Sequence, residues 1–204
     1  MIPTRDDWKR FCSSLGISDA QQFDALKSCY SQPDRYYHNF EHIGACLSEL
    51  GPASHLCHDI LSVECAIWFH DAVYDSKAKD NEAQSAALAL KWLQSVKVPD
   101  QFSKKVESLI MDTRHAAIPV EIDSQIIVDV DLSILGQSEN VFDEYERNIR
   151  KEYAWVPDDQ FRAGRKAVLE GFLRRATIYS TGYFKRKYEE SARRNLERSI
   201  ARLA

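Results

Sequence analysis

Apolar residues recur along this chain at the spacing of an α-helix. Three stretches place apolar side chains three or four residues apart, the period that keeps them on one face of a helix. The three stripes are Ala86, Leu90 and Leu93; Phe102, Val106, Leu109 and Ile110; and Phe142, Tyr145, Ile149 and Tyr153. Alternating apolar and polar positions, which mark a half-buried strand, are scarce. The pattern therefore predicts an all-α protein.

Residues that begin and end helices fall between these stripes. Gly16 is expected to end a first helix, and Ser18 is expected to cap a second. Asp100 is placed to cap a helix over residues 101–113. The short, apolar and β-branched run 126–135 fits either a buried strand or a buried helix. We predict a helix there, because no partner strand is evident elsewhere.

The length and composition suit one compact domain. The chain has 204 residues, of which 44% are hydrophobic and 28% charged, as in ordinary globular proteins. We expect residues 1–204 to form a single compact bundle of roughly eight to ten helices. No apolar run approaches the roughly 20 residues of a membrane span. The N-terminus lacks the apolar segment of a signal peptide. These features predict a cytoplasmic protein with no membrane partner.

The charge and the cysteines narrow the function classes further. Residues 1–135 hold 12 basic and 20 acidic residues, whereas residues 136–204 hold 15 basic and 11 acidic ones. The basic part could face a phosphate or be a solvated helix face. No basic patch with interleaved aromatics indicates a nucleic-acid polymer as partner. Five cysteines without a CxxC pair argue against a disulfide framework.

Histidines and aspartates gather in three short stretches. His38 and His42 lie in YYHNFEHI, His70 and Asp71 in WFHDAVYD, and Asp131 in VDVDLSILG. Together they offer the mixture of imidazole and carboxylate ligands that a divalent, non-thiolate metal site uses. They make this helical chain a candidate metallohydrolase.

The first stretch gives its two histidines different surroundings. Asn39 is a natural N-cap, so a helix is expected to begin there. His38 then lies just outside the helix and His42 within its first turn. One could bind metal while the other carries a proton. Alternatively, both are surface or capping histidines.

The second stretch follows an apolar segment, residues 60–69, that is typical of a buried helix. A charged Asp71 at the end of such a helix needs a partner, and a divalent cation is one. An imidazole–carboxylate hydrogen bond is the alternative. Adjacent helical residues point about 100° apart, so His70 and Asp71 converge on one ion only near a helix end or bend.

In the third stretch, Asp129 and Asp131 stand two residues apart, so they do not share one face of a regular helix. Asp131 is the predicted ligand, and Asp129 is predicted to support the site or to cap a helix. Two solvent-facing aspartates are the alternative.

The order His, His-Asp, Asp resembles the HD superfamily of metal-dependent phosphohydrolases. Over most of its length the chain is similar to a group of small bacterial-type proteins described only as predicted HD phosphohydrolases. Their patterns RxYHNxxHI, WFHDxVYD, DNExxSA and DADLxxLG correspond here to residues 35–43, 68–75, 80–86 and 129–136. The last stretch has DVDL in place of DADL, which keeps both carboxylates. The resemblance implies an HD-type helical domain.

The YHNxxH stretch is also similar to the signature of the cyclic nucleotide phosphodiesterases. This resemblance implies that His38 is the proton donor to the leaving oxygen. It implies metal ligands at four positions, which are His42, His70, Asp71 and Asp131. The nucleotide clamp of those larger enzymes is not recognisable here, so specificity for cyclic nucleotides does not follow.

A set of two imidazoles and two carboxylates leaves positions open for water and a phosphate oxygen. It suits Mn²⁺, Mg²⁺, Fe or Zn²⁺. Such an ion lowers the pKa of bound water, and a nearby imidazole is a suitable proton donor. We therefore predict a metal-dependent phosphohydrolase, acting on a small, phosphorylated, nucleotide-like substrate.

Supporting residues are predicted more loosely. Glu82 could order a catalytic water or merely favour a helix start. His115 could contact phosphate or a second metal. Arg150, Arg165 and Arg193 could form a phosphate fork, although each could be structural. Arg35 is expected to hold the histidine stretch by pairing with a carboxylate.

Two other functions fit the same residues. A metal-binding regulatory or ligand-binding module of HD fold would keep the ion without catalysis. An HD-fold oxygenase would use two irons and would need further ligands. The sequence leaves the oligomeric state open.

Overall fold

The computed structural model describes residues 2–19 and 21–203, and over these residues the regular structure is entirely helical. The predicted all-α class is confirmed. The α-helices are α1 (Arg5–Ser14), α2 (Gln21–Cys29), α3 (Phe40–Ala53), α4 (Ile60–Phe69), α5 (Asn81–Ser95), α6 (Asp100–Asp112), α7 (Ile122–Asp131), α8 (Glu139–Glu152), α9 (Asp158–Leu173) and α10 (Gly182–Leu203). Two 3₁₀ turns complete the set, η1 (Ser54–Leu56) and η2 (Leu132–Gly136).

The local signals place most helix ends, with two corrections. Gly16 follows α1 with a φ of +71°, the left-handed conformation that glycine adopts without strain. Ser18 does not cap α2. The carboxylate of Asp19 accepts from the backbone N–H groups of Gln21 and Gln22 instead. Asp100 is the first residue of α6 and caps nothing with its side chain. At α2, the carboxylate of Asp19 lies one residue closer to the helix than Ser18 and satisfies its free N–H groups.

The ambiguous apolar run is helical, as predicted. Residues 122–131 form α7, and the chain tightens directly into η2. Ile126 to Val130 are all buried, so the run is apolar because both sides of the helix face protein. This is why its periodicity could not distinguish a helix from a strand.

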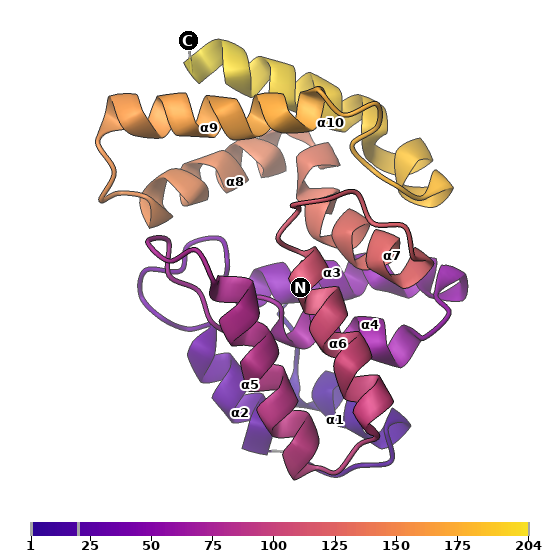
Figure 1. The fold of residues 1–204 in the computed structure, drawn as a ribbon. Helices are drawn as coiled ribbons and strands as arrows, with labels where there is room; N and C mark the ends of the chain where they lie inside the picture. Colours follow the sequence, from indigo (N-terminus) through magenta and orange to yellow (C-terminus); the bar gives the residue numbers. More distant parts are fainter. Residues whose placement is uncertain (1, 20, 204) are drawn as a thin grey trace.

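The helices form two groups with the candidate site elements between them. In Figure 1, α8, α9 and α10 lie at the top, α1, α2, α5 and α6 at the bottom, and α3, α4 and α7 between. Helices α3, α4 and α7 pack against one another. An aromatic cluster anchors the lower group, where Trp8 packs edge-on to Trp68 at 5.2 Å between ring centroids. Such buried aromatic pairs add about 0.5–1.5 kcal/mol beyond area burial. Helix α4 therefore has a fixed position.

Two contacts fix the upper group on η2 and α7. A Cβ atom at Gly136 would lie 2.5 Å from Tyr188 Cβ, so only glycine lets α10 approach η2. The buried Asp129 carboxylate accepts from the backbone N–H groups of Ser180 and Thr181, just before α10. Asp129 does not cap a helix itself: Thr181 Oγ1 accepts from Phe184 N–H in the first turn of α10 and donates to Asp129, so Asp129 holds the capping residue. No helix in the described ranges is long and apolar enough to cross a membrane.

Candidate metal centre

The start of α3 places His42. Asn39 is the N-cap, and its side chain accepts from the backbone N–H groups of Glu41 and His42. The helix therefore begins where the sequence predicts, and His42 lies in its first turn with its ring buried. Tyr37 packs against that ring at 4.8 Å between centroids.

The end of α4 places His70 and Asp71. His70 is the C-cap of α4, so His70 and Asp71 lie at the end of the helix. The sequence predicted that these two adjacent side chains could face one ion only at such a helix end. His70 Nδ1 lies 2.9 Å from the carbonyl oxygen of Ile67 and donates to it. This bond leaves the Nε2 lone pair facing the other polar side chains.

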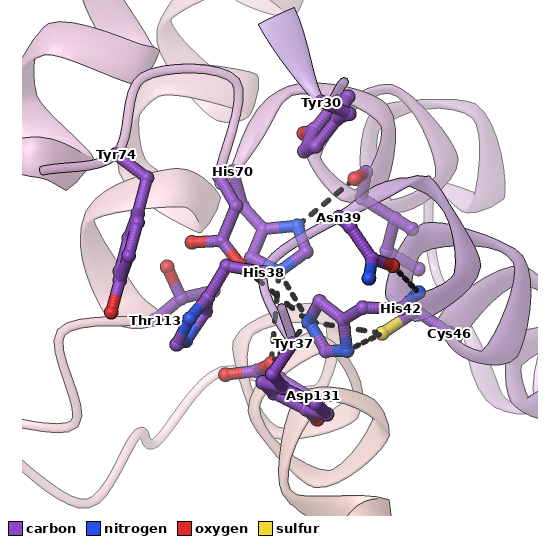
Figure 2. Close-up of polar contacts among 12 residues, drawn as sticks. Tyr30, Tyr37, His38, Asn39, His42, Cys46, His70, Tyr74, Thr113 and Asp131 are labelled. Carbon is purple, nitrogen blue, oxygen red and sulfur yellow. Dashed lines mark hydrogen bonds and ion pairs between the residues drawn. The ribbon is translucent and has the colours of Figure 1, made fainter. Parts of the chain in front are cut away.

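Four side chains meet where α3, α4 and α7 end or begin: His42, His70, Asp71 and Asp131. Five separations between their donor atoms lie between 3.1 and 3.6 Å. Ligand atoms that share one ion at about 2.0–2.2 Å lie roughly 2.8–3.6 Å apart, at the short end for neighbouring octahedral positions and at the long end for tetrahedral ones. The donor set and its spacing therefore fit a single divalent cation. Figure 2 shows both imidazoles directed toward Asp131.

Cys46, which the sequence analysis did not nominate as a ligand, lies beside these four side chains. His42, Cys46, His70 and Asp131 form a mostly buried group that could hold a metal ion. Cys46 Sγ lies 3.7 Å from both ring nitrogens of His42, so it stands beside the ring and off the Nε2 lone-pair direction. Asp71 Oδ2 is closer, at 3.5 Å from His42 Nε2 and 3.3 Å from His70 Nε2. Because Asp71 Oδ2 lies closer than Cys46 Sγ to the Nε2 atom of His42, the geometry favours Asp71 over Cys46 as a ligand.

The charges of this group depend on one another. Burial by itself lowers the pKa of His70, yet Asp71 and Asp131 raise it well above the usual value. Burial by itself raises the pKa of Asp131, yet His115, His42 and His70 hold it well below the usual value. The carboxylates thus need positive charge beside them, which either protonated imidazoles or a cation can supply.

His115 holds Asp131 from the other side. Its Nε2 lies 2.8 Å from Asp131 Oδ2, while Asp131 Oδ1 faces the two imidazoles. His115 has a φ of +54°, and its buried Nδ1 has no hydrogen-bond partner among the described residues. Arg175 donates to the His115 carbonyl and holds this strained backbone. His115 thus orients a carboxylate of the group.

His38 has a partner that the sequence did not indicate. Its Nδ1 lies 2.6 Å from the buried Glu152 carboxylate at the end of α8, and Tyr74 stacks on its ring. Glu152 also accepts from the backbone N–H groups of Tyr37 and His38. Burial by itself lowers the pKa of His38, but the hydrogen bond to Glu152 and the negative charges of Asp71, Glu152 and Asp131 together raise it above the usual value. Because Glu152 is 114 residues away, no local pattern could have revealed it.

Arg35 ties the two histidine stretches together by a different route from the predicted one. It is buried and donates to the backbone carbonyls of His38, Asp71 and Ala72. The prediction of a carboxylate partner was wrong. The turn after α4 exposes carbonyls without helical partners, and the guanidinium satisfies them.

A cavity of about 600 Å³ opens beside the group. Its lining includes His38, His70, Asp71 and Asp131, together with Glu82 from the first turn of α5. A phosphate ester with a sizeable organic group would fit in this space. Glu82 faces the cavity, as a role at a bound water would require.

Arg165 and Arg150, which were predicted to contact phosphate, are each held by other residues of the chain. Arg165 lines the cavity, but its guanidinium pairs with Glu146 and donates to Tyr145. Arg150 is not part of the lining. It donates to the carbonyls of Tyr153 and Val156 and pairs with Asp158, which fixes the turn between α8 and α9. The structure gives Arg150 a structural role and no support as a substrate ligand.

Comparisons of the chain with protein-family models, with curated proteins and with solved structures each gave no match.

Proposed function

We propose that this protein is a metal-dependent phosphohydrolase that acts on a small phosphorylated substrate. The observation that carries the proposal is the convergence of His42, His70, Asp71 and Asp131 beside a cavity that also contains His38. The resemblance to HD phosphohydrolases names the same residues for the same roles. We propose the two histidines and two aspartates as ligands, and Mn²⁺, Mg²⁺, Fe or Zn²⁺ as the ion.

A divalent cation in this group supplies Lewis acidity, which withdraws charge from a phosphoryl group and makes water a better nucleophile at neutral pH. The chain's own residues supply the rest. His70 is held by Ile67 and Asp131 by His115, so the donor atoms keep their directions. This preorganisation avoids the cost of ordering the ligands when substrate binds.

His38 is the proposed proton donor to the leaving oxygen. Glu152 binds Nδ1, so Nε2 is the ring nitrogen left to exchange a proton with the cavity. The raised pKa favours the protonated imidazole, which is the form that a general acid requires. Tyr74, which stacks on His38 and donates to Glu152, limits ring rotation.

Two measurements test the proposal. Protein purified without chelator is analysed for metals, and metal-reconstituted protein is assayed against nucleotide monophosphates, cyclic nucleotides and pyrophosphate. We expect about one divalent ion per chain and hydrolysis of at least one phosphoester. Full metal occupancy with no hydrolysis under any metal would instead favour a metal-binding regulatory module. Two irons per chain would favour an oxygenase.

A further inference from the structure

The cavity beside His42, His70, Asp71 and Asp131 (the metal group) is lined by two cations that have no charged partner among the described residues. Lys79 follows the His70–Asp71 turn, and Arg114 precedes His115. Both side chains are exposed and line the cavity. Neither has an ion pair, a side-chain hydrogen bond or a ring contact within residues 2–19 and 21–203. Arg165, which also lines the cavity, differs from them because its guanidinium pairs with Glu146.

Apart from Glu82, the other charges of the lining have a partner or would gain one from a bound cation. Arg165 is matched by Glu146, and His38 by Glu152. A divalent cation would balance Asp71 and Asp131. Beyond these pairs the lining keeps two positive charges, Lys79 and Arg114, against one negative charge, Glu82. The cavity is therefore suited to a substrate with more negative charge than the metal centre alone would attract.

The two cations come from different segments. Lys79 lies just before α5, and Arg114 lies after α6, next to the residue that bonds Asp131. Long cationic side chains in such positions reach an anion without rearranging the core. Arginine offers a planar fork and lysine a mobile point charge, and both are common phosphate ligands.

We propose that Lys79 and Arg114 select phosphomonoesters over phosphodiesters. This inference rests on the proposed phosphohydrolase function and narrows its substrate class. Near pH 8 a phosphomonoester is a dianion, because its second pKa is about 6. A phosphodiester carries one negative charge. The extra charge of the monoester is the feature that two unpaired cations recognise, whereas the metal group and His38 serve both esters alike.

The test compares p-nitrophenyl phosphate with bis(p-nitrophenyl) phosphate at pH 8 and low salt, using Mn²⁺-loaded protein. In the double variant K79A/R114A we expect KM for the monoester to rise about tenfold, and KM for the diester to change less than about twofold. Inorganic phosphate, measured by calorimetry on Mn²⁺-loaded protein, should bind about tenfold more weakly. Both side chains are exposed, so truncation should leave folding intact.

A matched control removes the same charge elsewhere. Lys77 lies in the same loop but stacks on Trp155, and Arg174 pairs with Glu170. Neither lines the cavity. The double variant K77A/R174A should keep the wild-type preference. If it lowers monoester affinity as much as K79A/R114A does, the effect is general charge attraction and the proposal is wrong.

The two proposals fail in different ways. Equal changes in KM for both esters, or no change in either, would overturn the selection by Lys79 and Arg114 while the phosphohydrolase function stands. If wild-type protein hydrolyses neither ester nor any phosphoester of the panel, yet loses phosphate affinity in K79A/R114A, the cation pair stands and the hydrolase function fails.

Discussion

His70 and His38 both lie beside carboxylates, but in different arrangements. His70 belongs to a group of two imidazoles and two aspartates whose donor atoms face one another. His38 forms a one-to-one pair with Glu152. The group needs added positive charge at its centre, whereas the pair is complete when His38 is protonated. The difference separates residues suited to hold a cation from a residue suited to move a proton.

Removing a member of the group should have the largest effect. We expect His70→Ala or Asp131→Asn to lower metal content well below that of wild type and to lower kcat/KM by at least about 10³-fold. Metal analysis and steady-state kinetics measure both. His55→Ala is the control, because His55 is exposed and its side chain lies beside the carbonyl oxygen of Pro52, with no other polar partner in the described part of the chain. Normal metal content in both variants would refute the assignment of the group.

Metal removal should also affect stability. A cation that binds only the folded state stabilises it, and chelation removes this contribution. We expect chelator to lower the Tm of wild type by several degrees, because a loss of about 1 kcal/mol of stability lowers Tm by roughly 2–4 °C in a domain of this size. The same chelator should leave the Tm of Asp131→Asn nearly unchanged. An equal shift in both proteins would place the bound metal elsewhere.

Removing the proton donor should lower turnover without releasing metal. We expect His38→Ala to lower kcat by about 10²–10⁴-fold, the usual contribution of a general acid. Metal content should stay at the wild-type value. A substrate with a good leaving group, such as p-nitrophenyl phosphate, should be affected least, because its leaving oxygen needs the proton less. Loss of metal in His38→Ala would place this histidine in the metal group.

Removing only the partner of His38 should change the pH dependence. Because Glu152 raises the pKa of His38, the protonated donor persists to higher pH in wild type. In Glu152→Gln we expect the alkaline limb of the kcat profile to move to lower pH, with metal content unchanged. Glu144→Gln is the control, since Glu144 is an exposed residue of α8 that pairs with Arg147. An alkaline limb that stays in place would contradict the proton-donor role.

The smallest effect should come from Cys46. Because its thiol stands beside the His42 ring, we expect Cys46→Ser to change metal content and kcat by less than about twofold. Cys65→Ser is matched in chemistry and burial but lies away from the group. If Cys46→Ser loses metal while Cys65→Ser keeps it, the thiol is a ligand and the proposed set of two histidines and two aspartates must change.

The sequence predicted most of what depends on neighbours along the chain. The period of the apolar stripes gave the all-α class, and Asn39 begins α3 as expected. The residue types in three short stretches nominated His38, His42, His70, Asp71 and Asp131 together, and the resemblance to HD phosphohydrolases singled out the last four as ligands. The failure at Ser18 was also local, since the neighbouring Asp19 competes for the same free N–H groups. At Asp100 the helix begins one residue earlier than predicted, so this residue lies inside α6.

Only the tertiary structure decided the partners. Glu152 reaches His38 across 114 residues, and Arg35 reaches Asp71 across 36. Both pairings depend on how α8 and the turn after α4 pack, which sequence periodicity does not encode. The same holds for the cations, since Arg165 is neutralised by Glu146 while Lys79 and Arg114 stay unpaired in the described structure. A helix is set by residues three or four apart, whereas a charge is paired or left free by side chains that packing brings together.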